Sequence, residues 1–304
     1  MQISETNYQS RLFPYAYNIL GSVDDARDAI QDVMEKHLTG PQRELDNESA
    51  YLIRSVINHA INLKKRQNRI VESGVWLPEP LMTADTDEIV VGHEPIANDR
   101  ADDSIIRQEV ISYSMLVLLE YLKPKERAVF ILKEAYDYSH DEIAETLSIS
   151  VDNSRKLLSR AKNELNARRT MKTKPSSSAT SLMLSHYIEL IKTGDTTALE
   201  QMLSNDIVMK TDGGKVRIVK AITEGRKDVM ALLFYVYQTY QAKFTLRITT
   251  VNFEPAILFY QGENLLNCQV FQLTDDGDRI DNMYSIVDPR KLKNLEAQMR
   301  STVD

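Results

Sequence analysis

The stretch that decides the fold runs from Leu122 to Arg169 and reads LKPKERAVFILKEAYDYSHDEIAETLSISVDNSRKLLSRAKNELNARR. Its apolar spacing predicts a short helix over 141–147, a tight turn at 148–150 and a basic helix that begins at Val151. Two helices joined by so short a turn have the spacing of a helix-turn-helix, whose second helix enters the major groove of DNA. The stretch therefore predicts a DNA-reading module.

The second helix of this module carries the side chains that suit DNA contact. Lysine and arginine outnumber acids between Val151 and Arg169, while leucine and alanine form an inward stripe. Arginine and lysine can bond guanine edges, and asparagine can pair with adenine. The candidate DNA-reading residues are Asn153, Arg155, Lys156, Ser159 and Arg160. The alternative is a solvated basic helix in an all-helical bundle.

Composition limits what the whole chain can be. With 304 residues it has room for two or three domains, and its net charge of -7 requires that any DNA contact come from segregated basic patches. The single cysteine, Cys268, excludes an internal disulfide framework and a cysteine-rich zinc site. The five histidines are scattered, so we expect no metal site and no cofactor.

The chain carries no recognisable export or membrane signal. Residues 1–6 have no cationic segment followed by an apolar run, and no stretch approaches about 18 uncharged apolar residues. We therefore expect a cytoplasmic protein with no membrane partner.

The N-terminal part of the chain has the pattern of helices. One apolar stripe ends at Gly21, and a second helix opens at Val23 with acids in its first turn, where the helix dipole favours them. A third helix from about Glu48 ends in a basic run, with five basic residues and no acid between Arg54 and Arg69. This run predicts a second cationic surface, separate in sequence from the helix-turn-helix.

Changes in composition divide the chain into segments. Prolines and a threonine- and acid-rich run mark one linker, a Pro-Ser stretch marks another, and from Phe244 the apolar period becomes two, as in strands. The predicted architecture is two all-α domains followed by an α+β domain. Its segments are a helical domain at 1–70, a linker at 71–108, the helix-turn-helix domain at 109–170, a linker at 171–180 and the α+β domain at 181–304.

The first 170 residues resemble an extracytoplasmic-function sigma factor of the sigma-70 family, since an acid-led helix, a basic helix and a helix-turn-helix follow in that order. The resemblance implies that the acid-led helix docks on the beta-prime clamp helices of core RNA polymerase, through Asp25, Asp28, Gln31, Asp32 and Met34. It assigns contact with the minus-10 promoter element to Asn58, Asn62, Lys64, Lys65, Arg66 and Arg69. The resemblance assigns contact with the minus-35 element to the helix-turn-helix, and it implies the polymerase beta flap as a further partner.

Three short motifs resemble those of sigma factors with a fused SnoaL-like C-terminal domain. The first is complete, the second is one glycine short, and the third has Asp288 and Arg290 where asparagine and an acid are usual. Their residues are Trp76, Leu77, Pro78, Glu79 and Pro80, then Asp212, Gly213, Gly214 and Lys215, and finally Asp288, Pro289, Lys291 and Leu292. The resemblance implies that the fused domain is an intramolecular partner that regulates the sigma domains in cis, and the lone Trp76 is expected to dock on a domain.

Two other functions compete with this interpretation. One is an ordinary helix-turn-helix regulator whose C-terminal domain binds a small ligand, in a cone lined by aromatic residues between Phe234 and Phe271. The other is a SnoaL-like enzyme fused to a DNA-binding module, with His186, Asp206 and Asp212 as the candidates, although no acid–base pair stands out by spacing. The favoured hypothesis is a sigma factor with no catalytic residues of its own.

Overall fold

The computed structural model of the chain describes residues 5–40, 47–67, 75–83, 111–168 and 177–301. The chain divides into two compact units. The first comprises Met1–Asn68 and Asp85–Arg169, and the second comprises Arg69–Ala84 and Thr170–Asp304. A short piece of the first linker thus belongs to the unit that contains the C-terminal domain.

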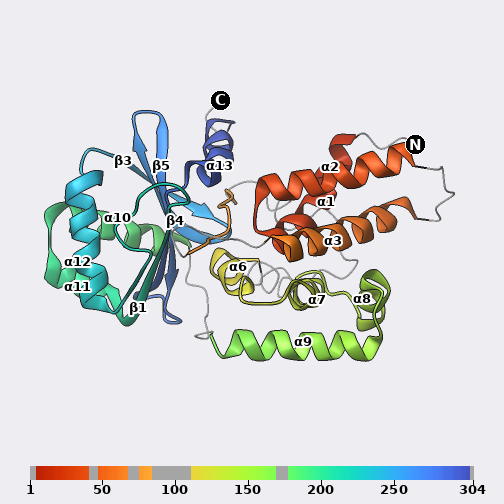
Figure 1. Cartoon of the computed structure of the whole chain (residues 1–304). Helices are drawn as coiled ribbons and strands as arrows, with labels where there is room; N and C mark the ends of the chain where they lie inside the picture. The colour runs from red at the N-terminus through yellow and green to blue at the C-terminus, as the bar shows by residue number, and fades with distance from the viewer. Residues whose placement is uncertain (1–4, 41–46, 68–74, 84–110, 169–176, 302–304) are drawn as a thin grey trace. The chain divides into compact units, whose positions relative to one another are not determined.

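The described part of the first unit is entirely helical (Figure 1). Its helices are α1 (Glu5–Leu20), α2 (Val23–Thr39), α3 (Glu48–Arg66), α6 (Tyr113–Leu119), α7 (Pro124–Glu134), α8 (His140–Leu147) and α9 (Val151–Asn166). Polar side chains start several of them by accepting a hydrogen bond from an unpaired backbone N–H of the first turn. These capping residues are Ser22, Asn47, Ser112, Ser139 and Ser150.

The predicted helix-turn-helix is confirmed. Ser139 and Glu142 form a capping box at the start of α8, and α8 ends at Ser148, whose φ of 51° is left-handed. The chain turns over residues 148–150, and the Ser150 side chain then caps α9 by accepting a hydrogen bond from the backbone N–H of Asn153. Ile143 and Leu147 of α8 are buried together with the inward stripe of α9.

The second unit is an α+β domain (Figure 1). Its helical elements are α10 (Ser177–Thr193), α11 (Thr196–Met202), α12 (Arg226–Val236), the π-helical turn η1 (Tyr237–Gln241) and α13 (Pro289–Ser301). Its strands are β1 (Leu203–Asp212), β2 (Ile222–Glu224), β3 (Thr245–Val251), β4 (Glu254–Gln261), β5 (Asn264–Leu273) and β6 (Ile280–Ile286). The predicted fold class of two helical regions followed by an α+β domain is therefore correct.

The strands form one mixed sheet in the order β2-β1-β6-β5-β4-β3. All neighbouring strands are antiparallel except β1 and β6, which run parallel and bring Asp212 opposite Ile286. This parallel pairing places the C-terminal end of β1 beside the C-terminal end of β6. Two of the three motifs follow those strand ends directly, so the topology brings them together.

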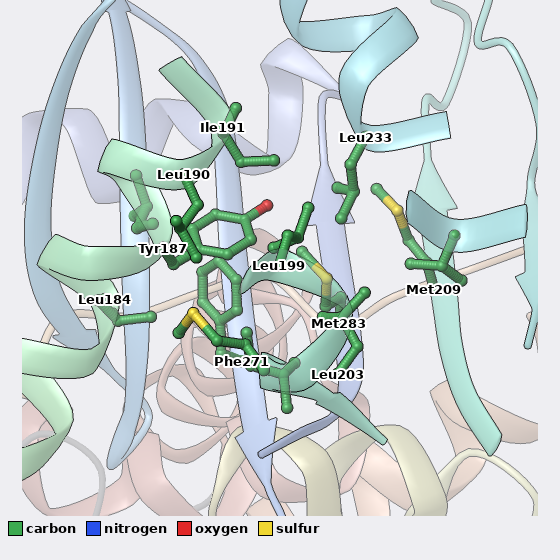
Figure 2. Packing of buried hydrophobic residues seen from close by; sticks show 14 of the residues in the cluster. Leu184, Tyr187, Leu190, Ile191, Leu199, Leu203, Met209, Leu233, Phe271 and Met283 are labelled. Atoms are coloured by element: carbon green, nitrogen blue, oxygen red, sulfur yellow. The ribbon is translucent and has the colours of Figure 1, made fainter. Parts of the chain in front are cut away.

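One face of the sheet is covered by α10, α11 and α12 (Figure 1). Figure 2 shows how side chains from these helices fill the space above the strands, where Tyr187 meets Phe271 edge-on with ring centroids 5.1 Å apart. The cluster also holds Leu190, Leu233 and Met283. Leu292 and Leu295 of α13 are also buried, and α13 lies on the other side of the sheet (Figure 1).

The aromatic residues that the sequence placed around a ligand cone are mostly part of this packed core. Tyr237, Phe259 and Phe271 are buried in the cluster, and Phe234 and Phe244 pack against it. Tyr235 and Tyr240 are wrong as cone residues, because about half of each side chain is exposed, at 51% and 55%. Tyr235 is two positions after Leu233 and therefore faces away from the core side of α12, while Tyr240 lies in the π-helical turn η1 that follows α12.

Candidate nucleic-acid interface

The recognition helix α9 presents its predicted DNA-reading residues to solvent. Asn153, Arg155, Lys156, Ser159 and Arg160 are all exposed, whereas Leu157, Ala161 and Leu165 are buried. Among the residues that the structure describes, Arg155 forms one ion pair, an exposed contact with Asp152 at 3.3 Å that is weak enough to exchange for a base or phosphate. The helix therefore presents a polar, cationic face whose side chains are free to reach into a groove.

A partly buried hydrogen bond fixes α9 on α8. His140 Nδ1 lies 2.9 Å from the hydroxyl of Ser154, which is fully buried beneath the recognition face. Burial lowers the pKa of His140, and the positive charges of Arg155 and Lys133 lower it further. The imidazole is thus neutral at physiological pH, and it holds the helix-turn-helix together without adding charge to the DNA-facing surface.

Helix α3 carries the second set of predicted DNA contacts, and these residues are in two different situations. Asn62, Lys65 and Arg66 are exposed, as a DNA-facing surface requires. Arg69 lies outside the described residues. Asn58 and Lys64, in contrast, are engaged by residues of the helix-turn-helix region.

The contacts of Asn58 and Lys64 are specific. The Asn58 side chain donates to the carbonyl of Thr146 in α8 at 2.7 Å. The Lys64 ammonium donates to both carboxylate oxygens of Glu120 at 2.7 and 2.8 Å, and to the carbonyl of Leu20 at 3.0 Å. Only 9% of the Lys64 side chain is exposed, so in this state it is not available to a phosphate.

Glu120 is the centre of a buried ionic cluster, which we call the Glu120 cluster and define as Lys64, Glu120 and Arg127. Arg127 is fully buried, and its guanidinium contacts Glu120 while Nε donates to the carbonyl of Asn18 at 2.8 Å. Removing water from these charges is costly, so each depends on its partners being present. The cluster ties α7 and the end of α6 to α1 and α3.

Further contacts surround the Glu120 cluster within the first unit. Asn18 donates to the hydroxyl of Tyr136 at 2.9 Å, and the rings of Tyr15 and Tyr136 lie 4.5 Å apart between centroids. At the rim, Arg54 pairs with Glu145 at 3.3 Å. The N-terminal helices and the helix-turn-helix region are thus joined by a buried polar core with an exposed ion pair at its edge.

The predicted polymerase-binding helix α2 is largely open to solvent. Asp28, Gln31 and Asp32 are exposed, and Met34 is half-buried. Asp25 accepts a hydrogen bond from Gln67 at 2.8 Å, which ties the start of α2 to the end of α3. The acidic face of α2 is therefore accessible in the same state in which part of the α3 surface is covered.

Residues from all three sequence motifs meet at one site in the second unit, which we call the linker clamp: Trp76, Leu77, Asp212, Gly214, Asp288 and Lys291. Lys215 of the second motif is exposed and takes no part in it. Asp212 accepts a hydrogen bond from the backbone N–H of Leu77 at 2.8 Å and an ion pair from Lys291 at 2.5 Å. The Lys291 ammonium also donates to the carbonyl of Leu77 and lies 4.2 Å from the centre of the Trp76 ring, a cation–π contact. The predicted docking of Trp76 on a domain is confirmed.

The departures from the usual motif residues are accommodated in the linker clamp. The carboxylate of Asp288 bonds Arg290 at 2.8 Å; burial opposes its ionisation, but the Arg290 hydrogen bonds hold its pKa below the ordinary value. Gly214 has a φ of +53°, and a Cβ there would lie 2.1 Å from an Asp288 oxygen. The shortened loop therefore still needs glycine at this position.

The rest of the segment 75–83 is also fixed on the second unit. Leu81 exchanges backbone and side-chain hydrogen bonds with Asn252, both at 2.9 Å, and Met82 forms a bridge with Val251 at the end of β3. Asn294 of α13 donates to Glu79 at 3.4 Å. Most of the segment is buried, so this part of the linker behaves as an added element of the α+β domain.

Sequence reasoning did not identify several residues that build these sites. Glu120 and Arg127 have the pattern of ordinary charges on a helical surface, and Asn252 that of a turn. Asn252 and Phe253 have positive φ values of 45° and 61°, because the tight turn between β3 and β4 requires this conformation. Arg127 follows Lys125 and Glu126 at the start of α7, so the local pattern gave no signal that it is buried and paired.

The candidate catalytic residues have separate partners. His186 is exposed and lies 3.9 Å from Glu189, Asp206 is exposed on β1, and Asp212 belongs to the linker clamp. Within the described residues no group of three or more histidines, cysteines or acids could hold a metal ion. Among the same residues, no helix is long and apolar enough to cross a membrane.

Comparison with known proteins agrees with this arrangement. Residues 6–70 match the family model for sigma-70 region 2, and residues 113–165 match that for sigma-70 region 4. The chain is 23% identical to the probable ECF RNA polymerase sigma factor SigI of Mycobacterium tuberculosis, over 96% of this chain and 94% of that protein. It is 24% identical to SigJ of the same organism, over 79% and 74% respectively.

A solved structure shows the same fold. The crystal structure of M. tuberculosis SigJ superposes with a TM-score of 0.72 at 21% identity, over 96% of this chain and 99% of that one. A region 2 bundle, a region 4 helix-turn-helix and the order in which they occur define a sigma factor of the sigma-70 family. The relatives that the chain matches over most of its length are extracytoplasmic-function sigma factors, and the fold that it shares with SigJ includes the C-terminal α+β domain.

Proposed function

We propose that this sigma factor exists free in a closed state, in which region 4 covers part of the DNA-reading surface of region 2. Sigma factors as a family bind core RNA polymerase and promoter DNA and catalyse no reaction themselves. The observation that carries the proposal is the engagement of Asn58 and Lys64 by Thr146 and Glu120. Neither side chain can contact the minus-10 element while those bonds are intact.

Core polymerase is the partner that opens the closed state. The acidic face of α2 is exposed, so the beta-prime clamp helices can dock on Asp28, Gln31 and Asp32 before the two regions separate. Binding of region 4 to the beta flap then supplies the energy that replaces the contacts of the Glu120 cluster. A ligand can shift such an equilibrium only by binding one state better than the other, and core enzyme does so because it holds the two regions apart.

The C-terminal domain regulates the sigma regions in cis by holding the linker. Segment 75–83 lies between region 2 and region 4 along the chain, and the linker clamp binds it to the α+β domain. Weak contacts suffice for this because tethering keeps the local concentration of the segment high, at roughly millimolar. A linker that is bound at the clamp has fewer free residues to join region 2 and region 4 when they contact two separate promoter elements. The clamp therefore favours the closed state.

The C-terminal domain acts here as a regulator and not as an enzyme, and the protein works in the cytoplasm, where core polymerase and DNA are found. The role as a regulator is supported by the space above the sheet, which packed aliphatic and aromatic side chains fill (Figure 2). The only candidate acid with a buried partner, Asp212, is used by the linker clamp.

Run-off transcription with core polymerase tests the proposed function, and the double variant R155A/K156A sharpens it. Each side chain that contacts a base is worth about 1–3 kcal/mol, so we expect roughly a tenfold to hundredfold loss of promoter-specific transcript. The matched control K192A removes an exposed lysine of α10 and should leave transcription unchanged. A chain that ends near Lys174 lacks the linker clamp and should still yield a promoter-specific transcript. No promoter-specific transcript from either length would refute the proposed function.

A further inference from the structure

The loop between β1 and β2 carries an exposed cationic cluster that the linker clamp does not use. We call residues 213–221 the basic loop; it contains three basic residues and no acid in a chain whose net charge is -7. Lys215, Arg217 and Lys220 are exposed, and none of the three takes part in an ion pair with any residue that the structure describes. Exposed cations gathered without acidic partners are the footprint of an anionic ligand.

The fold holds the basic loop in place. The backbone N–H of Thr211 donates to the carbonyl of Ala221 at 2.8 Å, and that of Val216 donates to Gly213 at 2.7 Å. A Cβ on Gly213 would lie 2.5 Å from the Val216 carbonyl, so the turn is tight. The loop is therefore the rigid tip of a hairpin, and its cations project from a fixed base.

Two tyrosines adjoin the basic loop. Tyr235 and Tyr240 are half-exposed, pack edge-on with centroids 6.3 Å apart, and Arg217 lies near enough to act electrostatically on Tyr240. A hydrogen bond with Tyr235 raises the pKa of Tyr240, so its hydroxyl stays protonated near neutral pH. Tyrosine hydroxyls join arginine and lysine as common donors to the phosphates of nucleic acids.

From these observations we infer that the basic loop, with Tyr235 and Tyr240, binds the phosphate backbone of promoter DNA beside the site read by region 4. The inference rests on the proposed function, because region 4 must bring the domain to DNA. Distance supports it: residues 167–176 separate the end of α9 from the start of α10, and even fully extended a chain of that length spans only about 35 Å. The domain thus stays near the DNA that α9 contacts, at high local concentration.

The salt dependence of promoter binding by the holoenzyme tests this inference. Removing the cation from one phosphate reduces the slope of log K against log salt by about 0.9, so the full-length variant R217Q/K220Q should lower it by about 2. The control variant K243Q/K293Q removes the same charge from exposed lysines before β3 and on α13. We expect the control to keep the wild-type slope, and R217Q/K220Q to bind three- to tenfold more weakly with an unchanged transcription start site.

The outcomes separate the two proposals. A slope for R217Q/K220Q equal to that of K243Q/K293Q, with normal promoter binding, would overturn the inference and leave the sigma function standing. A change in affinity for core polymerase alone, without a change in slope, would assign the loop to an acidic protein surface and would also overturn it. Failure of the wild-type holoenzyme to bind any promoter would remove the proposed function and, with it, this inference.

Discussion

Replacing Glu120 with alanine is expected to separate region 4 from region 2 in the free protein. The change leaves the fully buried Arg127 and the nearly buried Lys64 without their carboxylate. Breaking one partner of a buried ion pair typically costs about 3–5 kcal/mol, because the remaining charge stays buried and uncompensated. Denaturant unfolding should show this loss in the first unit, and the free chain should bind DNA fragments more tightly once Lys64 is released.

A matched control for Glu120→Ala lies at the rim of the same interface. Glu145→Ala removes the partner of Arg54, an ion pair with 42% and 78% of its side chains exposed, and exposed pairs are worth about 0–1 kcal/mol. If E120A fails to fold, the triple variant K64M/E120M/R127M tests the same interface. Apolar side chains of similar volume often replace a buried ionic cluster with little loss of stability, so this variant should fold without the cluster. Equal stability of E120A and E145A would contradict the buried role of the cluster.

Replacing Asp212 with alanine is expected to release the linker from the C-terminal domain. Lys291 then keeps a buried ammonium without an acid, and the backbone N–H of Leu77 loses its acceptor. The loss of stability should again be about 3–5 kcal/mol. It should weaken the docking of segment 75–83 as well as the fold of the domain. Trp76 is the only tryptophan, so its fluorescence should shift to longer wavelength as the ring enters water.

Two variants make the Asp212 experiment specific. Asp212→Asn keeps an oxygen that can accept from Leu77 but removes the charge, so its effect should be intermediate. Arg300→Ala breaks an exposed ion pair with Glu296 on the same helix as Lys291 and should leave the fluorescence and the protease sensitivity of the linker unchanged. In run-off transcription, released linkers should raise the activity of the full chain. Unchanged fluorescence and protease resistance in D212A would contradict the linker clamp.

The elements with strong local patterns could be predicted from the sequence. The helix-turn-helix follows from the apolar spacing of α8 and α9 and from the tight turn between them. Strands β3 to β6 followed from their period-two pattern. Strands β1 and β2 and helix α13 were not predicted, because β1 interleaves charged with apolar residues and β2 has only three residues.

The candidate site was only partly accessible from sequence, for a physical reason. Local pattern identifies which side chains can contact DNA, as it did for Arg155 and Lys156, but not which of them are covered by another part of the chain. The hydrogen bonds of Asn58 with Thr146 and of Lys64 with Glu120 join residues far apart in sequence. No periodicity or spacing reports such pairs, so the closed state could be recognised only in three dimensions.

The separation of region 2 and region 4 is the most direct measure of the closed state. Cysteines placed at Leu38 on α2 and Asn163 on α9, both exposed, can carry spin labels. Burial raises the pKa of the native Cys268 thiol, so it should not react. The closed state predicts one short, narrow distance distribution in the free protein, and a longer one when core polymerase is bound or when Glu120 is replaced by alanine. A broad, long distribution in the free protein, unchanged by core polymerase, would contradict it.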